Sequence, residues 1–105
     1  MMLRVHVPVE DGNESMQSGD MQHIIEEVMQ RIQPEAMYFF VEDGMRASIA
    51  VFDMKDNSDM VSIAEPIFRS LNADVQFTPV MNLDDLRKGL SQVGAGSEIG
   101  QRATD

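Results

Sequence analysis

The 105 residues are enough for one domain, and 43% hydrophobic with 25% charged residues is typical of a globular protein. The net charge of −10 repels nucleic-acid phosphates and anionic lipids, so neither nucleic acid nor a membrane is an expected partner. The lack of cysteine excludes disulfides and thiolate sites, and no apolar run reaches the ~18–20 residues that cross a bilayer. Because no signal-peptide pattern is present, we expect a cytoplasmic protein.

Hydrophobic periodicity in the first third of the chain predicts a strand, a loop and a helix. Alternating apolar residues define the strand: Leu3, Val5, Val7 and Val9. The polar segment 10–19 predicts a loop. Asp20 is a candidate N-cap for a helix whose apolar residues recur at helical spacing from Met21 to Ile32, and Pro34 ends it.

A hairpin is predicted next, with strands at Ala36–Val41 and Met45–Met54. We expect three residues of the first strand to share a core face with three of the second: Met37, Phe39 and Val41 with Ala47, Ile49 and Val51. A two-residue Asp43-Gly44 turn would break this match, because it pairs Phe39 with Ser48. A three-residue loop closed by Gly44 in the left-handed conformation keeps it and is therefore favoured.

The remaining pattern predicts a helix, a strand and a short helix. Asn57-Ser58 caps the first of these helices, which Pro66 kinks or splits, and its apolar positions run to Leu71. Val75–Met81 is the last strand, placed at a sheet edge by Pro79. Asn82 caps a helix from Leu83 to about Leu90, and residues 91–105 are expected to be a disordered tail. The folded domain is thus predicted to span residues 1–90.

The order of elements predicts an α+β fold, a ferredoxin-like βαββαβ sandwich. Right-handed connections place the first and third strands in the centre of a four-stranded antiparallel sheet, with both helices on one face. The other face is left open and is predicted to carry a mixture of aromatic and polar side chains. Since a mixed surface without cover usually meets a partner, we expect a homodimer that pairs through this open face and encloses a cleft.

The chain resembles small uncharacterised bacterial proteins of the dimeric α/β-barrel group of ferredoxin-like domains. Three segments carry the resemblance: Pro34–Phe40 (PEAMYFF), Ala64–Phe68 (AEPIF) and Pro79–Leu86 (PVMNLDDL). It covers residues 3–81. The resemblance implies a dimer and a cleft between two sheets, and the group includes binding modules, small isomerases and monooxygenases.

Two sets of side chains are candidates for chemistry in the cleft. His6 is a candidate general base and Tyr38 a candidate acid, with an interface histidine as the alternative for His6. Arg4 and Arg46 are candidates for binding a small organic anion, or else form salt bridges in which Glu42 is the neighbour of Arg46. The complete set predicted to bind a ligand is Arg4, His6, Tyr38, Phe40, Arg46, Ser48, Phe52 and Thr78.

No metal or cofactor is expected. Four of the ten methionines fall on predicted core-facing positions, where methionine fills gaps: Met21, Met29, Met37 and Met60. The acidic loop that starts at Asp11 lacks the glycine and glutamate of a calcium loop, with Met16 and Gln22 in their places. No phosphate-binding, nucleophile-elbow or zinc motif is present.

Three functions follow from this interpretation. The leading hypothesis is a non-enzymatic homodimeric module with a small-molecule cleft on the open face. The first alternative is a cofactor-independent isomerase or monooxygenase with His6 as base. The second alternative is a protein-interaction adaptor whose partner covers the same face.

Overall fold

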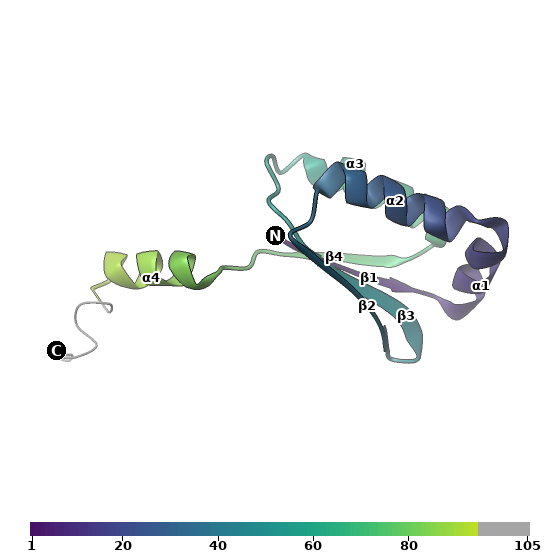
Figure 1. Cartoon of the computed structure of the whole chain (residues 1–105), viewed down its shortest axis with the longest axis horizontal. Coiled ribbons are helices and arrows are strands. Elements are labelled where there is room, and N and C mark those ends of the chain that lie inside the picture. Colours follow the sequence, from purple (N-terminus) through teal and green to yellow (C-terminus); the bar gives the residue numbers. More distant parts are fainter. Residues whose placement is uncertain (95–105) are drawn as a thin grey trace.

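The computed structural model describes residues 1–94, which form one antiparallel sheet and four helices. The elements are, in chain order, β1 (Met2–Val7), α1 (Val9–Ser18), α2 (Asp20–Ile32), β2 (Ala36–Glu42), β3 (Met45–Val51), α3 (Asp59–Leu71), β4 (Asp74–Thr78) and α4 (Leu83–Gln92). Helices α2 and α3 form a layer over one face of the sheet, α1 lies at one end of that layer, and α4 projects away from the body (Figure 1). The α+β class is confirmed.

The sheet has the order β2-β3-β1-β4, and every neighbouring pair of strands is antiparallel. The first and third strands therefore occupy the centre, as predicted. β4 is an edge strand and ends at Thr78, so Pro79 lies just outside the ladder, where its missing N–H group does no harm. The other edge is β2, which is longer and carries three aromatic residues: Tyr38, Phe39 and Phe40.

The core lies between the sheet and the two long helices. On β1 the helix-facing residues Leu3, Val5 and Val7 are all buried. Helices α2 and α3 contribute apolar residues spaced three or four apart, which is why each packs one stripe on the sheet: Ile24, Val28 and Ile32, then Ile63, Ile67 and Leu71. The helix predicted to end before Pro34 does so, with Gln33 in the left-handed conformation and its N–H donating to the Met29 carbonyl at 3.0 Å.

The polar segment after β1 is a helix, and the predicted loop is wrong. α1 begins directly after Pro8, and the acidic residues Glu10 and Asp11 in its first turn suit the positive end of the helix dipole. Inside it, the buried Ser15 hydroxyl donates to the Gly12 carbonyl at 3.0 Å. Gly19, with φ of 87°, ends α1 and leads into α2. Apolar residues are too sparse in this segment to reveal the helix by periodicity.

Two expectations concern the C-terminal half. Of the kink or split predicted at Pro66, the split is excluded, because α3 is one helix through Pro66. The buried residues Ile63 and Ile67 on either side of Pro66 hold both halves on the sheet. α4 continues to Gln92, so the tail predicted from residue 91 begins too early. The rest of that predicted tail, residues 95–105, lies outside the described residues.

The β2–β3 hairpin has a two-residue turn, and the predicted three-residue loop is wrong. Glu42 pairs with Met45, while Asp43 and Gly44 have φ angles of 56° and 75°, the type I′ geometry that Asp-Gly favours. Phe39 is therefore paired with Ser48. This register turns every β3 side chain to the face opposite the predicted one.

The faces of β3 follow from its pairing with β1. Leu3 pairs with Ala50 and Val5 with Ser48, so the even-numbered residues of β3 face the helices. The odd-numbered residues lie on the open face: Ala47, Ile49 and Val51. Phe52, which follows β3 directly, is only 3% exposed and belongs to the core.

Candidate functional site

The eight residues predicted to line one cleft are divided between the two faces of the sheet. The register places five of them on the open face: Arg4, His6, Tyr38, Phe40 and Thr78. Arg46 and Ser48 lie on the helix face, and Phe52 is buried in the core, so the prediction that these three face the open side is wrong. The structure therefore holds two candidate surfaces, one on each face.

A cluster of three polar side chains lies on the open face. The Glu42 carboxylate atom Oε1 accepts a hydrogen bond from Arg4 Nη1 at 2.8 Å and lies 2.7 Å from His6 Nε2. Glu42 comes from the edge strand β2, and it reaches the central strand β1 across β3. The intervening β3 residue, Ala47, is small enough to lie beneath the three side chains and is 5% exposed.

Glu42 is the residue that sequence reasoning missed. The sequence predicts Glu42 in the hairpin loop, as a neighbour of Arg46, but its side chain lies on the other face from Arg46. The hydrogen bond from His6 and the positive charge of Arg4 lower the pKa of the Glu42 carboxyl below its usual range. The Asp43-Gly44 dipeptide was the available signal, because a two-residue turn places Glu42 on the same face as His6.

His6 and Tyr38, the candidate base and the candidate acid, lie on different strands of the open face. His6 is level with Ala47 and Asp74, whereas Tyr38 is level with Ile49 on β3 and lies on the far edge strand. His6 lines a shallow depression of about 440 Å³ at one end of the sheet. That depression is lined by His6, Pro8, Asp43, Met45, Asn72, Ala73, Asp74 and Gln76.

The open face is apolar on one half. The β2 and β3 residues on this side are almost all hydrophobic: Ala36, Tyr38, Phe40, Ala47, Ile49 and Val51. We call this set the apolar half of the open face. Tyr38, on the edge strand β2, is 67% exposed. The β4 side of the same face is polar, with Asp74, Gln76 and Thr78.

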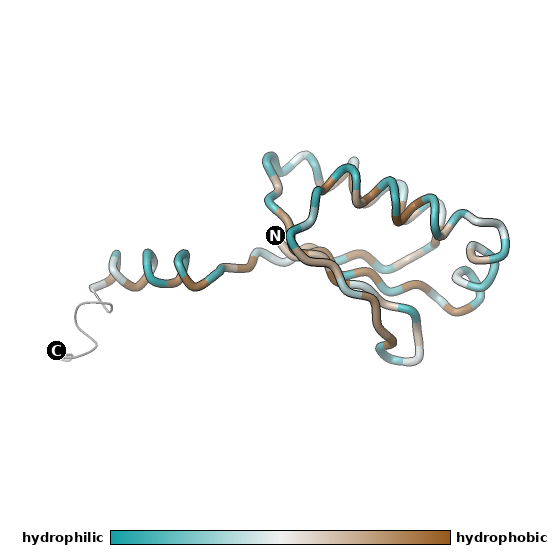
Figure 2. Tube along the Cα trace, in the orientation of Figure 1, coloured by the Kyte–Doolittle hydropathy of each residue, from teal (hydrophilic) through white to brown (hydrophobic). Residues whose placement is uncertain are grey.

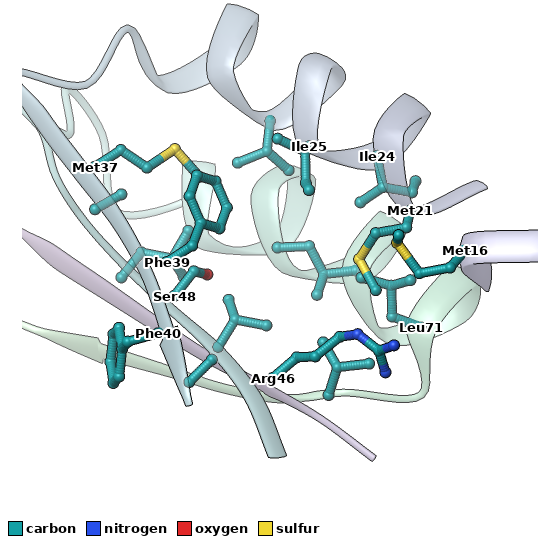
Figure 3. Close-up of a pocket in the computed structure, with 17 residues that line it drawn as sticks. Met16, Met21, Ile24, Ile25, Met37, Phe39, Phe40, Arg46, Ser48 and Leu71 are labelled. Atoms are coloured by element: carbon teal, nitrogen blue, oxygen red, sulfur yellow. The ribbon is translucent and has the colours of Figure 1, made fainter. Parts of the chain in front are cut away.

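A groove on the other face lies between α2 and the β2–β3 hairpin, and its cavity volume is about 240 Å³ (Figure 3). Its walls are hydrophobic side chains of both layers, and Figure 3 shows Met37 and Phe39 on the hairpin facing Ile25 on α2. The groove exists because α2 and α3 lie over the middle of the sheet and leave the edge strand β2 partly uncovered. Phe39, on the helix-facing side of β2, is 58% exposed for this reason.

Arg46 and Ser48 supply the polar side-chain groups of the groove. Both project from β3 into the space between the layers (Figure 3). The Arg46 guanidinium lies against the α1 backbone at Gly12, where an added Cβ would come within 2.5 Å of Nη1, and Nη2 donates to Asn13 Oδ1 at 3.1 Å. Within residues 1–94, Arg46 and Lys88 are the two basic side chains with no carboxylate in salt-bridge distance.

Neither a metal centre nor a membrane span is found in the described part of the chain. No group of three potential metal-ligating side chains is present among residues 1–94. Over the same residues, no helix is both long and apolar enough to span a bilayer. No protein-family model matches this chain, and no curated protein matches it.

Proposed function

We propose that this protein is a homodimeric binding module of the ferredoxin-like kind that takes up a small organic anion with an apolar body. This proposal rests on the groove between α2 and the β2–β3 hairpin, whose lining is hydrophobic except for the side chains of Arg46 and Ser48. A concave apolar site with a few polar groups is the usual form of a small-molecule site. The ligand site is thus moved from the open face, where the sequence analysis had placed it, to the helix face.

The charge of Arg46 supports an anionic ligand. Arg4, the other arginine in the predicted site, is already bonded to Glu42, so its charge is neutralised. Arg46 bonds only to the neutral amide of Asn13 among the described residues and keeps its charge. Arginine binds carboxylates through two parallel hydrogen bonds, and such charge-assisted bonds are stronger than neutral ones.

The size of the groove limits the apolar body of the ligand. A volume of about 240 Å³ holds roughly eight groups of the size of a water molecule, at ~30 Å³ each. A linear carboxylate of about eight carbons therefore fits the described space. A long-chain lipid would have to extend past Phe39 into solvent.

The sheet order supports the ferredoxin-like assignment. Two strand–helix–strand units with the first and third strands in the centre are what that topology requires. α1 and α4 are additions to it. The apolar half of the open face supports the homodimer, because an exposed hydrophobic sheet face usually meets a partner.

Isothermal titration calorimetry with octanoate and with octanol tests the ligand class. The two probes share the apolar chain and differ in the charged head. We expect octanoate to bind the wild-type protein about tenfold more tightly, equivalent to ~1.4 kcal/mol. Chemical-shift changes in the ¹⁵N spectrum should fall on the groove strands, with Phe39 and Ser48 among the affected residues.

Arg46→Gln should remove the preference for octanoate and leave octanol binding unchanged. Lys88→Gln is the matched control, because Lys88 is also outside any salt bridge but lies on α4, away from the groove. Equal binding of the two probes by the wild type, or equal loss of octanoate binding in both variants, would contradict the proposal.

The His6–Glu42 pair favours a second candidate function, a cofactor-independent isomerase or monooxygenase. A carboxylate within hydrogen-bond distance of histidine is the arrangement that orients and strengthens a general base. Glu42 takes the supporting role here, and Tyr38 has none because it lies away from His6. If this candidate is correct, Glu42→Gln lowers kcat and shifts the pH profile, while octanoate affinity stays unchanged.

A further inference from the structure

The C-terminal helix α4 makes no packing contact with the rest of the described protein. None of its residues is buried, and it lies beyond the end of β4 at the tip of an extended segment (Figure 1). The hydrophobic residues of α4 nevertheless recur along one side, as Figure 2 shows. This stripe consists of Leu83, Leu86, Leu90 and Val93, and it continues into Val80 and Met81 on the connecting segment.

A helix of this length needs a partner. Isolated helices shorter than ~12–15 residues are marginal in water, and α4 has ten residues. Its N-terminus is well specified, because Asn82 and Asp85 form a reciprocal capping box with hydrogen bonds of 3.2 and 2.8 Å. A cap contributes only about 1 kcal/mol, so the remaining stability has to come from burial of the stripe.

The apolar half of the open face has the dimensions of one helix. It is two strands wide, about 10 Å, which is the diameter of a helix with short side chains. Its length along β2, the five residues from Ala36 to Phe40, is ~17 Å, and the ten residues of α4 span ~15 Å. One helix can therefore cover this surface, just as α2 and α3 together cover the opposite face.

The sheet of the same chain is difficult for α4 to reach. The helix would have to lie over β2 and β3, about 12 Å sideways from β4 and ~10 Å above the sheet. The segment from Pro79 to Asn82 spans at most about 17 Å between Thr78 and Leu83, so it would have to be almost fully stretched across the sheet. In the structure it runs outward, along the direction of β4 (Figure 1).

We propose that α4 docks on the apolar half of the open face of a second copy of this chain. The α4 helix of the second copy docks on the first copy in the same way. The proposal rests on the homodimer proposed above and specifies the element that covers the face. Six apolar residues at roughly 60–120 Å² each give about 500 Å² per arm. With the matching sheet surfaces and two arms, about 2,000 Å² is buried, within the range of stable interfaces.

Light scattering coupled to size-exclusion chromatography on the full chain tests this arrangement. We expect the wild type to be a dimer at ~20 μM and Leu86→Asp to be a monomer with an unchanged fold. Gln92→Asp is the matched control, since it adds the same charge on the opposite side of α4, and it should remain a dimer. Tyr38→Asp, on the receiving surface, should also be monomeric.

Disulfide trapping distinguishes exchange between chains from folding back on the same chain. The protein has no cysteine, so the double variant Leu86→Cys/Tyr38→Cys offers one possible pair of thiols in each chain. On oxidation we expect covalent dimers on a denaturing gel. A monomer with an internal crosslink would overturn the proposal and identify the same chain as the docking site.

The outcomes also separate this proposal from the proposed function. A dimer that persists in Leu86→Asp overturns the docking of α4 but retains the homodimer. A wild-type monomer overturns both the docking and the homodimer. Octanoate binding concerns the groove on the helix face, so neither of these results confirms or contradicts it.

Discussion

Replacement of Phe52 and of Tyr38 by alanine tests which aromatic residues belong to the core and which to the open face. Phe52 is 3% exposed and Tyr38 is 67% exposed in one chain. A buried Phe→Ala substitution lowers the free energy of unfolding by ~3–5 kcal/mol, because it loses the transfer free energy of the ring and leaves a cavity. Such a loss is a large part of the ~5–15 kcal/mol expected for a domain, so Phe52→Leu is the milder second variant, at about 1–2 kcal/mol.

Tyr38→Ala should behave differently because the ring packs on little of its own chain. At a protein concentration below the dimer dissociation constant, we expect less than ~1 kcal/mol of destabilisation. At a concentration where the wild type forms the dimer, the destabilisation caused by Tyr38→Ala should be larger. The reason is that association stabilises the folded wild type by mass action.

Urea denaturation followed by circular dichroism at two protein concentrations measures both effects. The reasoning is refuted if Tyr38→Ala costs several kcal/mol at the low concentration, or if Phe52→Ala costs under 1 kcal/mol. The first result would place the Tyr38 ring in the core, and the second would place Phe52 on the open face, where the sequence had predicted it.

Three further predictions concern the turn, the groove and the polar cluster. Gly44 has a φ of 75° and open space around it, so Gly44→Ala introduces backbone strain without a clash. We expect urea denaturation to show a free energy of unfolding lower by ~1–2 kcal/mol. An unchanged denaturation midpoint would contradict the type I′ turn. Gly12→Ala should raise the free energy of unfolding by ~0.5–1 kcal/mol, because alanine is favoured over glycine inside a helix. The same substitution should weaken octanoate binding, because the new Cβ displaces the Arg46 guanidinium. An unchanged octanoate affinity would count against Arg46 as the anion ligand. Because the folded-state pKa of Glu42 is lowered, its contribution to stability is present above the ordinary value of 4.5 and is lost as the pH falls through the folded value. Denaturation midpoints of wild type and Glu42→Gln should therefore differ at pH 7 and converge in acid, and a constant difference down to pH 2 would exclude this linkage.

The order of elements could be predicted from the sequence because each long element carries its own periodic signal. α2 and α3 show apolar residues at helical spacing, and their bounds were predicted to within about two residues. α1 could not be predicted in this way. Its helix begins after Pro8, packs Gly12 against the Arg46 side chain and buries Ser15, and the last two features are tertiary contacts.

The candidate site was predicted only in part because one inference about the turn controlled it. The more hydrophobic alternate set of β3 was assigned to the core, as periodicity rules suggest, and this assignment excluded the two-residue turn. The Asp43-Gly44 dipeptide was the stronger signal, since its type I′ preference is local and does not depend on what covers each face. Accepting it would have placed Glu42 beside His6 and sent Arg46 to the helix face.

The failure of the hydrophobic pattern on β3 is itself informative about assembly. A lone domain gains most by turning its larger apolar residues toward its own helices, yet Ile49 and Val51 face the open side while Ser48 and Ala50 face α2. Full burial of the Ile49 and Val51 side chains would stabilise the folded state by ~1.5–3 kcal/mol each. In a single chain both side chains are only partly buried. The small residues under α2 open the groove, and the larger ones on the other side form the surface on which we place the partner's α4. The register thus suits the proposed homodimer, in which a second copy would cover the open face of β3.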